Sequence, residues 1–113
     1  MHTLNLDALP ARELFPGYRG RMVHSETMTL VFWEVTAGAQ APEHSHLHEQ
    51  IMTLVEGEFE LTVGGSTELL TAGAVVVIPP DVPHSGRAVT ACRIIDAFHP
   101  ARADLRSAHG PGR

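Results

Sequence analysis

With 113 residues, of which 43% are hydrophobic and 19% charged, the chain is long enough for one domain with a core of its own. Its formal net charge of −5 gives no basic surface for nucleic acid, and no run of about 18 apolar residues predicts a membrane span. The N-terminus lacks the basic, apolar and small-residue order of a signal peptide, so we expect a cytoplasmic protein. The single cysteine, Cys92, excludes an internal disulfide and lies in an apolar run that predicts a buried thiol.

The beginning of the chain differs in pattern from the rest. Leucines stand there among prolines and glycines, which predicts an arm over residues 1–20 with one helical turn at residues 10–14. The β-branched and aromatic run at residues 28–36 is too short and too alternating for a helix and predicts a strand. Its apolar side chains also predict a face that a second copy covers, and therefore a homodimer.

The remainder consists of short strand-like segments between turns, at residues 51–55, 58–63, 66–70, 74–78, from about His84, and 91–98. Residues 51–55 and 74–78 are mostly apolar, which predicts buried strands, and Gly64-Gly65 predicts a two-residue hairpin. About seven or eight strands with turns about every 8–12 residues predict an all-β sandwich or barrel. We expect it to span residues 21–106, with a flexible tail at 107–113.

Histidines and one amide concentrate in two places within this strand-rich region. His44, His46 and His48 alternate with other residues, Gln50 shares their parity, and His84 follows a proline-rich turn. In an extended segment, side chains two apart point to the same face, so these groups can converge. Neutral imidazole is a favoured ligand of divalent transition metals, and we therefore predict a metal site. Spacing alone does not separate His48 from the other two histidines of the cluster.

Two segments resemble the conserved motifs of the cupin family. The first is Gly38, five residues, His44-x-His46, then Gln50 and Glu56-Gly57; the second is Gly73, five residues, Pro79-x-Asp81-x-x-His84. The resemblance implies a small single-domain jelly-roll β-barrel that holds one metal ion with His44, His46, Gln50 and His84. Most cupins carry glutamate where this chain has Gln50, whose alternative role is to orient a ligand by a hydrogen bond.

A narrower resemblance lies near the C-terminus. Asp96-Ala-Phe98-His-Pro100-Ala-Arg102-Ala-Asp104 resembles the ending of the pectin-degradation (KdgF-type) cupins, which linearise 4,5-unsaturated uronates and also carry Gln at the third ligand position. The resemblance implies that Asp96, Phe98 and Arg102 line the active site. The structural alternatives are an Asp96 paired with Arg93 or Arg87, a surface arginine at Arg102, and a core side chain at Phe98.

The resemblance implies a metal-dependent, isomerase-type ring opening of a small anionic sugar. The metal would act as a Lewis acid, Asp96 as general acid and base, and Arg102 as the partner of the substrate carboxylate. Zinc, nickel, iron or manganese would serve as the divalent ion. Two alternatives remain open at this point: a non-catalytic cupin that binds a sugar or anion, and an iron-dependent dioxygenase.

Overall fold

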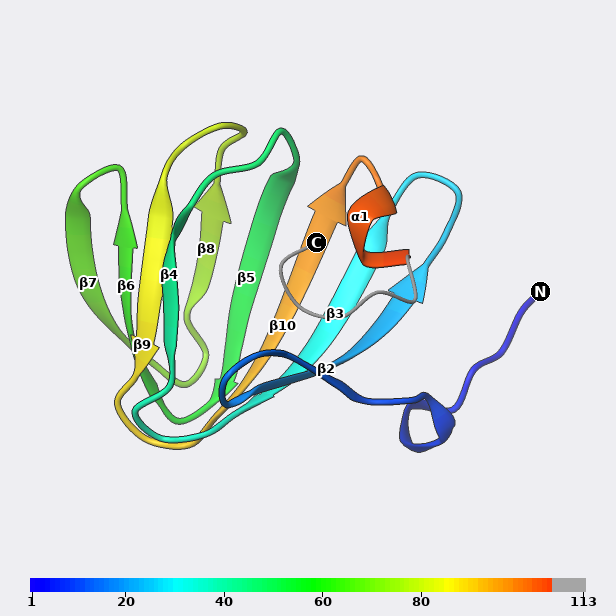
Figure 1. Ribbon diagram of the computed structural model, residues 1–113, viewed down its shortest axis with the longest axis horizontal. Helices are drawn as coiled ribbons and strands as arrows, with labels where there is room; N and C mark the ends of the chain where they lie inside the picture. The colour runs from blue at the N-terminus through cyan, green and yellow to red at the C-terminus, as the bar shows by residue number, and fades with distance from the viewer. Residues whose placement is uncertain (107–113) are drawn as a thin grey trace.

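The computed structural model describes residues 1–106 and shows, within them, ten strands in two antiparallel sheets that face each other (Figure 1). The six-stranded sheet contains, in spatial order, β1 (Arg12–Phe15), β2 (Tyr18–His24), β3 (Thr29–Val35), β10 (Cys92–His99), β5 (Glu49–Glu56) and β8 (Val75–Ile78). The four-stranded sheet contains β4 (Gln40–His44), β9 (His84–Ala88), β6 (Glu58–Val63) and β7 (Ser66–Thr71). The expectation of an all-β sandwich or barrel is confirmed.

Two short helices accompany the sheets. The 3₁₀-helix η1 (Leu6–Ala8) lies on a segment that extends away from the barrel, and α1 (Ala103–Arg106) follows β10 (Figure 1). No helix within residues 1–106 is long and apolar enough to cross a membrane. The predicted tail at residues 107–113 lies outside the described residues.

The hairpin and its neighbouring strands follow the local sequence closely. Strand β6 covers the predicted segment, and Gly64 and Gly65 adopt φ angles of 56° and 83° before β7 returns antiparallel. Both glycines occupy the left-handed region that a two-residue hairpin requires. The prediction of this hairpin is therefore confirmed.

The helical turn predicted at residues 10–14 is wrong. Strand β1 occupies this segment and pairs with β2, so that residues 12–20 belong to the six-stranded sheet and not to an arm lying over it. Strand β4 was not predicted either; it pairs with β9, and its register shifts between Ala41 and His44, around a proline. Both segments are extended because a neighbouring strand pairs with them, which local sequence patterns do not reveal.

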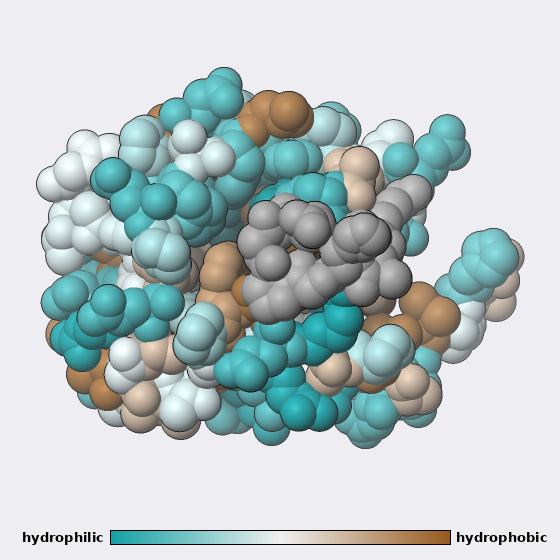
Figure 2. Space-filling model, viewed as in Figure 1, coloured by the Kyte–Doolittle hydropathy of each residue, from teal (hydrophilic) through white to brown (hydrophobic). Residues whose placement is uncertain are grey.

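The apolar strands β5 and β8 are buried on one face only. Ile51, Val55, Val75 and Val77 are between 42% and 62% exposed. The expectation of buried strands is therefore met only at their inward positions, which enter the core between the sheets. That core includes Leu54, Ile78, Val31 and the predicted buried thiol of Cys92. The hydropathy of one whole face is mixed, with hydrophobic residues in separate patches (Figure 2).

Candidate functional site

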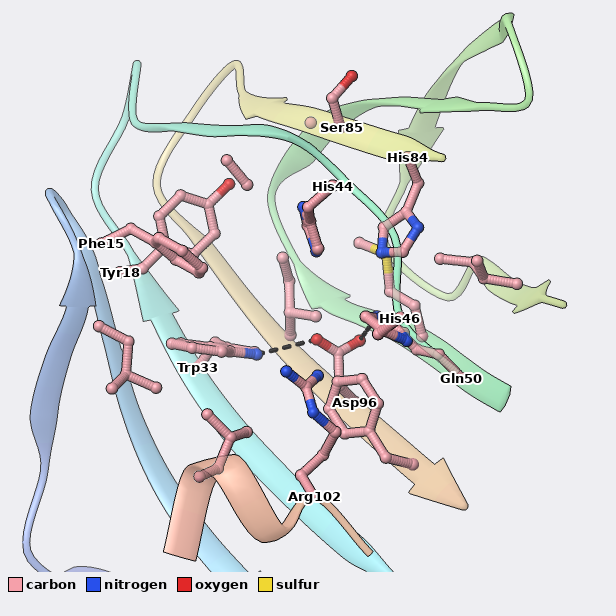
Figure 3. A pocket seen from close by; sticks show the side chains of 18 of the residues that line it. Phe15, Tyr18, Trp33, His44, His46, Gln50, His84, Ser85, Asp96 and Arg102 are labelled. Carbon is pink, nitrogen blue, oxygen red and sulfur yellow. Dashed lines mark hydrogen bonds between the residues drawn. The ribbon is translucent and has the colours of Figure 1, made fainter. Parts of the chain in front are cut away.

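Three histidines from two neighbouring strands and a loop converge inside the barrel (Figure 3). Strand pairing places His44, at the end of β4, directly opposite His84, at the start of β9. His46 follows in the β4–β5 loop, and its ring centroid lies 4.9 Å from that of His84 and 5.8 Å from that of His44. One ligand atom from each of these three residues lies within 4.8 Å of the others.

The hydrogen bonds of the three rings favour metal binding. Each Nδ1 lies close to a backbone carbonyl oxygen, at 2.8 Å for His44 with Pro42, 3.0 Å for His46 and 2.9 Å for His84. An Nδ1–H that donates to a carbonyl leaves the Nε2 lone pair free for an ion. The Nε2 atom of His84 is buried and has no hydrogen-bond partner within residues 1–106. The triad could therefore bind a metal ion.

The electrostatics of the site favour the neutral form of the His46 and His84 rings. Burial, with the positive charges of Arg102 and of a protonated His84, lowers the pKa of His46 to about 4. Burial is also the largest cause of the lowered pKa of His84. Because neutral imidazole is the form that coordinates a metal, the site is poised for binding near neutral pH.

Hydrogen bonds join Trp33 and Gln50 to the buried Asp96 carboxylate, and Gln50 in turn faces the triad (Figure 3). The Gln50 amide nitrogen donates to Asp96 Oδ1 at 2.9 Å, which turns Gln50 Oε1 toward His46 Nε2 at 3.2 Å. With His46 Nδ1 donating to the His48 carbonyl, both facing atoms are acceptors and do not form a hydrogen bond with each other. A cation between them would satisfy both atoms. This contact suits Gln50 as the fourth ligand.

Asp96 is buried and accepts two hydrogen bonds, from Gln50 and from Trp33 Nε1 at 2.9 Å. Burial raises the pKa of Asp96 to about 6, against the opposing effects of these hydrogen bonds and of Arg102. The alternative partners considered from the sequence bind elsewhere, since Arg93 pairs with Glu56 and Arg87 with Glu60. The Asp96 carboxylate thus lies beside the triad with a pKa suited to proton transfer.

Arg102 and Phe98 line the same cavity as the triad. The guanidinium carbon lies 4.7 Å from the centre of the Phe98 ring and points toward Asp96 in Figure 3. Arg102 is not a surface arginine, because it lines the cavity and its side chain is only 13% exposed. Its Nε and Nη2 atoms donate to the two carboxylate oxygens of Asp104 at 3.0 and 2.8 Å. Asp104, which sequence reasoning did not single out, therefore fixes the orientation of this arginine.

Two further histidines stay outside the group of converging residues. The His48 ring lies 5.5 Å from that of His46, but His48 does not line the cavity. His24 lies beside Thr29, with Nδ1 2.8 Å from the threonine hydroxyl oxygen. The geometry separates His48 from His44 and His46, which spacing alone did not. The chain leaves β4 after His44 and turns, so the alternation of side chains does not continue to His48.

The cavity has a volume of about 330 Å³ and a second wall that the sequence did not indicate. Phe15, Tyr18 and Trp33 form this wall, from β1, β2 and β3. Trp33 belongs both to the buried core and to this wall, and the inward position of Tyr18 becomes evident only once β2 is known to pair with β3. The site therefore has a polar half with the triad and an aromatic half opposite.

Comparisons with known proteins agree with this architecture. The family model for the cupin domain matches residues 31–98, more than half of the chain. The pectin degradation protein KdgF of Dickeya dadantii is 28% identical over 102 residues, which cover 88% of this chain and 93% of that protein. The HTH-type transcriptional regulator PuuR of Escherichia coli is 34% identical over 91 residues, 74% of this chain, but the match spans only 49% of the regulator.

Two solved structures are similar along nearly the whole chain. An RmlC-like cupin from Shewanella frigidimarina superposes with a TM-score of 0.88 at 31% identity, covering 93% of this chain and 96% of that one. KdgF from a Halomonas species superposes with a TM-score of 0.87 at 26% identity, covering 93% and 98%.

Proposed function

The chain belongs to the cupin family, and on that premise we propose that it is a metal-dependent enzyme that opens 4,5-unsaturated uronates to linear keto-sugars. The observation that carries the proposal is the buried Asp96 carboxylate, connected through Gln50 to the histidine triad. Similarity to KdgF proteins over nearly their whole length supports it. The cytoplasmic location expected from the sequence stays a prediction.

The ligand set favours an anionic substrate. When bound by His44, His46, Gln50 and His84, a divalent zinc, nickel, iron or manganese ion would supply a Lewis acid whose charge no ligand neutralises. Arg102 adds a second positive group on the Phe98 side of the cavity, and Asp104 holds its orientation. In this proposal the guanidinium binds the substrate carboxylate through Nη1, the nitrogen that does not donate to Asp104.

The reaction requires one proton to leave and one to arrive, with no change in redox state. The proton of the C1 hydroxyl is removed, the bond between C1 and the ring oxygen breaks, and C4 receives a proton as C5 becomes a ketone. Asp96 takes the first proton and returns it to C4, so the same carboxyl group acts as base and then as acid. Its pKa of about 6 leaves it mostly ionised at neutral pH and still able to return the proton.

The test is to incubate the metal-loaded protein with 4,5-unsaturated galacturonate and to follow the absorbance of its conjugated double bond. We expect the absorbance to fall with turnover and to stay constant with metal-stripped protein. Unsaturated uronates from alginate serve as a second substrate. If neither substrate is consumed by the metal-loaded protein, the catalytic proposal is wrong.

A ligand-binding role without catalysis is the second candidate, because PuuR, at 34% identity, is a transcriptional regulator. The match covers about half of that regulator, so any sensing role here concerns the shared cupin part alone. Binding of galacturonate by calorimetry without turnover of the unsaturated sugar would favour this reading. Oxygen consumption, measured in parallel, would indicate a dioxygenase instead.

The homodimer is likewise a proposal, supported by the outer face of the six-stranded sheet. There, five apolar residues from five strands are neighbours in register and form an outer row: Val77, Ile51, Ala97, Leu30 and Val23. A continuous apolar row on one sheet face suits a two-fold contact between copies.

Charged residues border this outer row toward the opposite end of the strands. Arg21 pairs with Glu34 at 2.9 Å, and Arg93 with Glu56 at 3.7 Å. An apolar centre with a charged rim is the usual composition of a protein interface.

A further inference from the structure

The aromatic half of the cavity has no role in the proposed reaction. We call it the aromatic compartment; it is lined by Leu14, Phe15, Tyr18, Trp33 and Ala41. The Tyr18 ring centroid lies 5.7 Å from those of both Phe15 and Trp33, and the rings meet edge to face. Phe15 also lies 6.4 Å from the ring of His44, so the compartment begins directly beside the triad (Figure 3).

Two contacts hold Trp33 against the wall and keep the compartment open. A Cβ atom added at Gly20 would lie 2.9 Å from Cζ3 and 3.0 Å from Cε3 of Trp33, so the indole lies flat on the β2 backbone. At its other end, Trp33 Nε1 donates to Asp96 at 2.9 Å. The ring is therefore fixed at both ends, and the space beside it is preorganised for a ligand.

The Tyr18 hydroxyl is the unpaired polar atom of this compartment. Tyr18 is only 5% exposed, and its hydroxyl lies near the Ala41 backbone without a hydrogen bond of ordinary geometry within residues 1–106. A buried hydroxyl without a partner is unfavourable, and natural structures rarely retain one without a reason. The neighbouring Leu14 and Phe15 side chains present only carbon. The compartment thus offers a ligand apolar surface and one hydroxyl.

We propose that the aromatic compartment binds a flat, largely apolar group of a carboxylate ligand whose other end is anchored at the histidine triad. A saturated sugar ring would bring several hydroxyl groups against Leu14, Phe15 and Trp33, where they would stay unpaired. A planar group stacks on aromatic rings and needs few polar partners. The inference rests on the anion anchor of the proposed function and widens the ligand class to carboxylates with a planar body.

The test compares two 2-hydroxy acids on the metal-loaded protein. Glycolate and mandelate share the carboxylate and the neighbouring hydroxyl, and they differ by one phenyl ring. Burial of that ring should make mandelate bind about tenfold tighter or more. Calorimetry measures both affinities, and the fluorescence of Trp33, the single tryptophan of the chain, reports occupation of the compartment.

Two variants test the location and replace no proposed metal ligand. Ala41→Leu fills the compartment, so mandelate should fall to the affinity of glycolate while glycolate binds as before. Phe15→Ala, at a half-buried position, removes one stacking surface and should reduce the advantage of mandelate alone. A hydroxyl added to the phenyl ring at its 3- or 4-position should increase affinity, and Tyr18→Phe should remove that gain.

The results separate this inference from the proposed reaction. The compartment would be overturned if mandelate and glycolate bound within about twofold of each other, or if neither bound. An equal loss of affinity for both acids in Ala41→Leu would also overturn it. The absence of any gain from a ring hydroxyl would also contradict it. Turnover of unsaturated uronates is measured independently: tight mandelate binding without turnover leaves the compartment standing and removes the reaction.

Discussion

The two faces of the six-stranded sheet present different side chains from the same three strands, and we propose a different role for each face. On the inner face, β3, β10 and β5 contribute Trp33, Asp96 and Gln50, which hydrogen bonds join into one chain. One position away, the same strands present apolar side chains outward: Phe32, Ala97 and Ile51. Because side chains alternate along a strand, a shift of one residue moves from the proposed reactive site to the proposed assembly surface. The proposed activity of the inner face depends on the positions of single atoms. The proposed association through the outer face depends on the total apolar area that is buried.

Asp96→Asn should have the largest effect on the inner face. We expect turnover of unsaturated uronate to fall by about 10²- to 10⁴-fold, the range for loss of general acid–base catalysis. An amide at this position also accepts from only one of the two donors, Trp33 and Gln50, so Gln50 can rotate away from His46. Metal content by elemental analysis must therefore accompany the rate.

The double variant Gln50→Glu/Asp96→Asn separates these two effects. In this double variant the carboxylate stands at position 50, beside the proposed metal site, and it can accept a hydrogen bond from the amide at position 96. Metal binding should therefore be retained while turnover stays lost. Full activity in this double variant would remove Asp96 from the mechanism.

His84→Ala should weaken metal binding by about 100-fold or more, since it removes a proposed direct ligand and not merely an orienting contact. The His46→Ala variant should behave in the same way. His48→Ala is the matched control: this histidine is adjacent in sequence but does not line the cavity, so metal binding should stay unchanged. Stoichiometric metal in the His46→Ala/His84→Ala double variant would show that the site is wrong.

The raised pKa of Asp96 predicts a pH effect on the metal-free protein. With a folded pKa of about 6 and an ordinary value of 3.8, the folded state binds this proton more tightly than the unfolded state. Stability from this group is therefore present at low pH and is lost as the pH rises from about 4 to 6, by about 2–3 kcal/mol.

Urea unfolding at pH 4 and pH 7.5 measures this difference. Relative to Asp96→Asn, the unmutated protein should lose stability across this interval. Parallel curves for the two proteins would contradict the assigned pKa. The ionised form is the base, so turnover should also decline below about pH 6.

Changes on the outer face should have the smallest effect on the site. Ile51→Lys places a charge in the middle of the outer row, and we expect the mass in solution to fall from dimer to monomer. Leu69→Lys is the control, because Leu69 is an exposed apolar residue of β7 in the other sheet. Light scattering measures both variants, and metal binding should differ from the unmutated protein by less than about twofold. A monomeric unmutated protein would refute the assembly proposal.

Most strands could be predicted from local pattern, and the errors share one physical cause. The hairpin at Gly64-Gly65 follows from local backbone preference, and alternation indicated β6. Whether Ile51 or Val77 faces the core depends on which elements pack against each face of the sheet. The local sequence pattern does not carry this information. The same limitation applies to β1, which is extended because β2 pairs with it.

The candidate site could be predicted only where chemistry marks the residues. His44, His46 and His84 are conspicuous as residue types, and the structure brings them together. Phe15 and Tyr18 are ordinary apolar residues by sequence, and their position in the cavity follows from pairing across β1, β2 and β3. Contacts such as Gln50 with Asp96 join residues 46 positions apart and were not expected.

The pairing of His44 with His84 has a mechanical consequence. Within residues 1–106, β4 is an edge strand that pairs only with β9, with an irregular register near Pro42. An ion bound by these two histidines would cross-link β4 and β9 at the end of that strand pair. Stripping the ion should then loosen the edge, with faster amide hydrogen exchange and earlier protease cleavage between residues 40 and 48 than elsewhere in the barrel. Loading with metal would slow local opening there, so the cofactor would regulate how long the barrel wall stays closed.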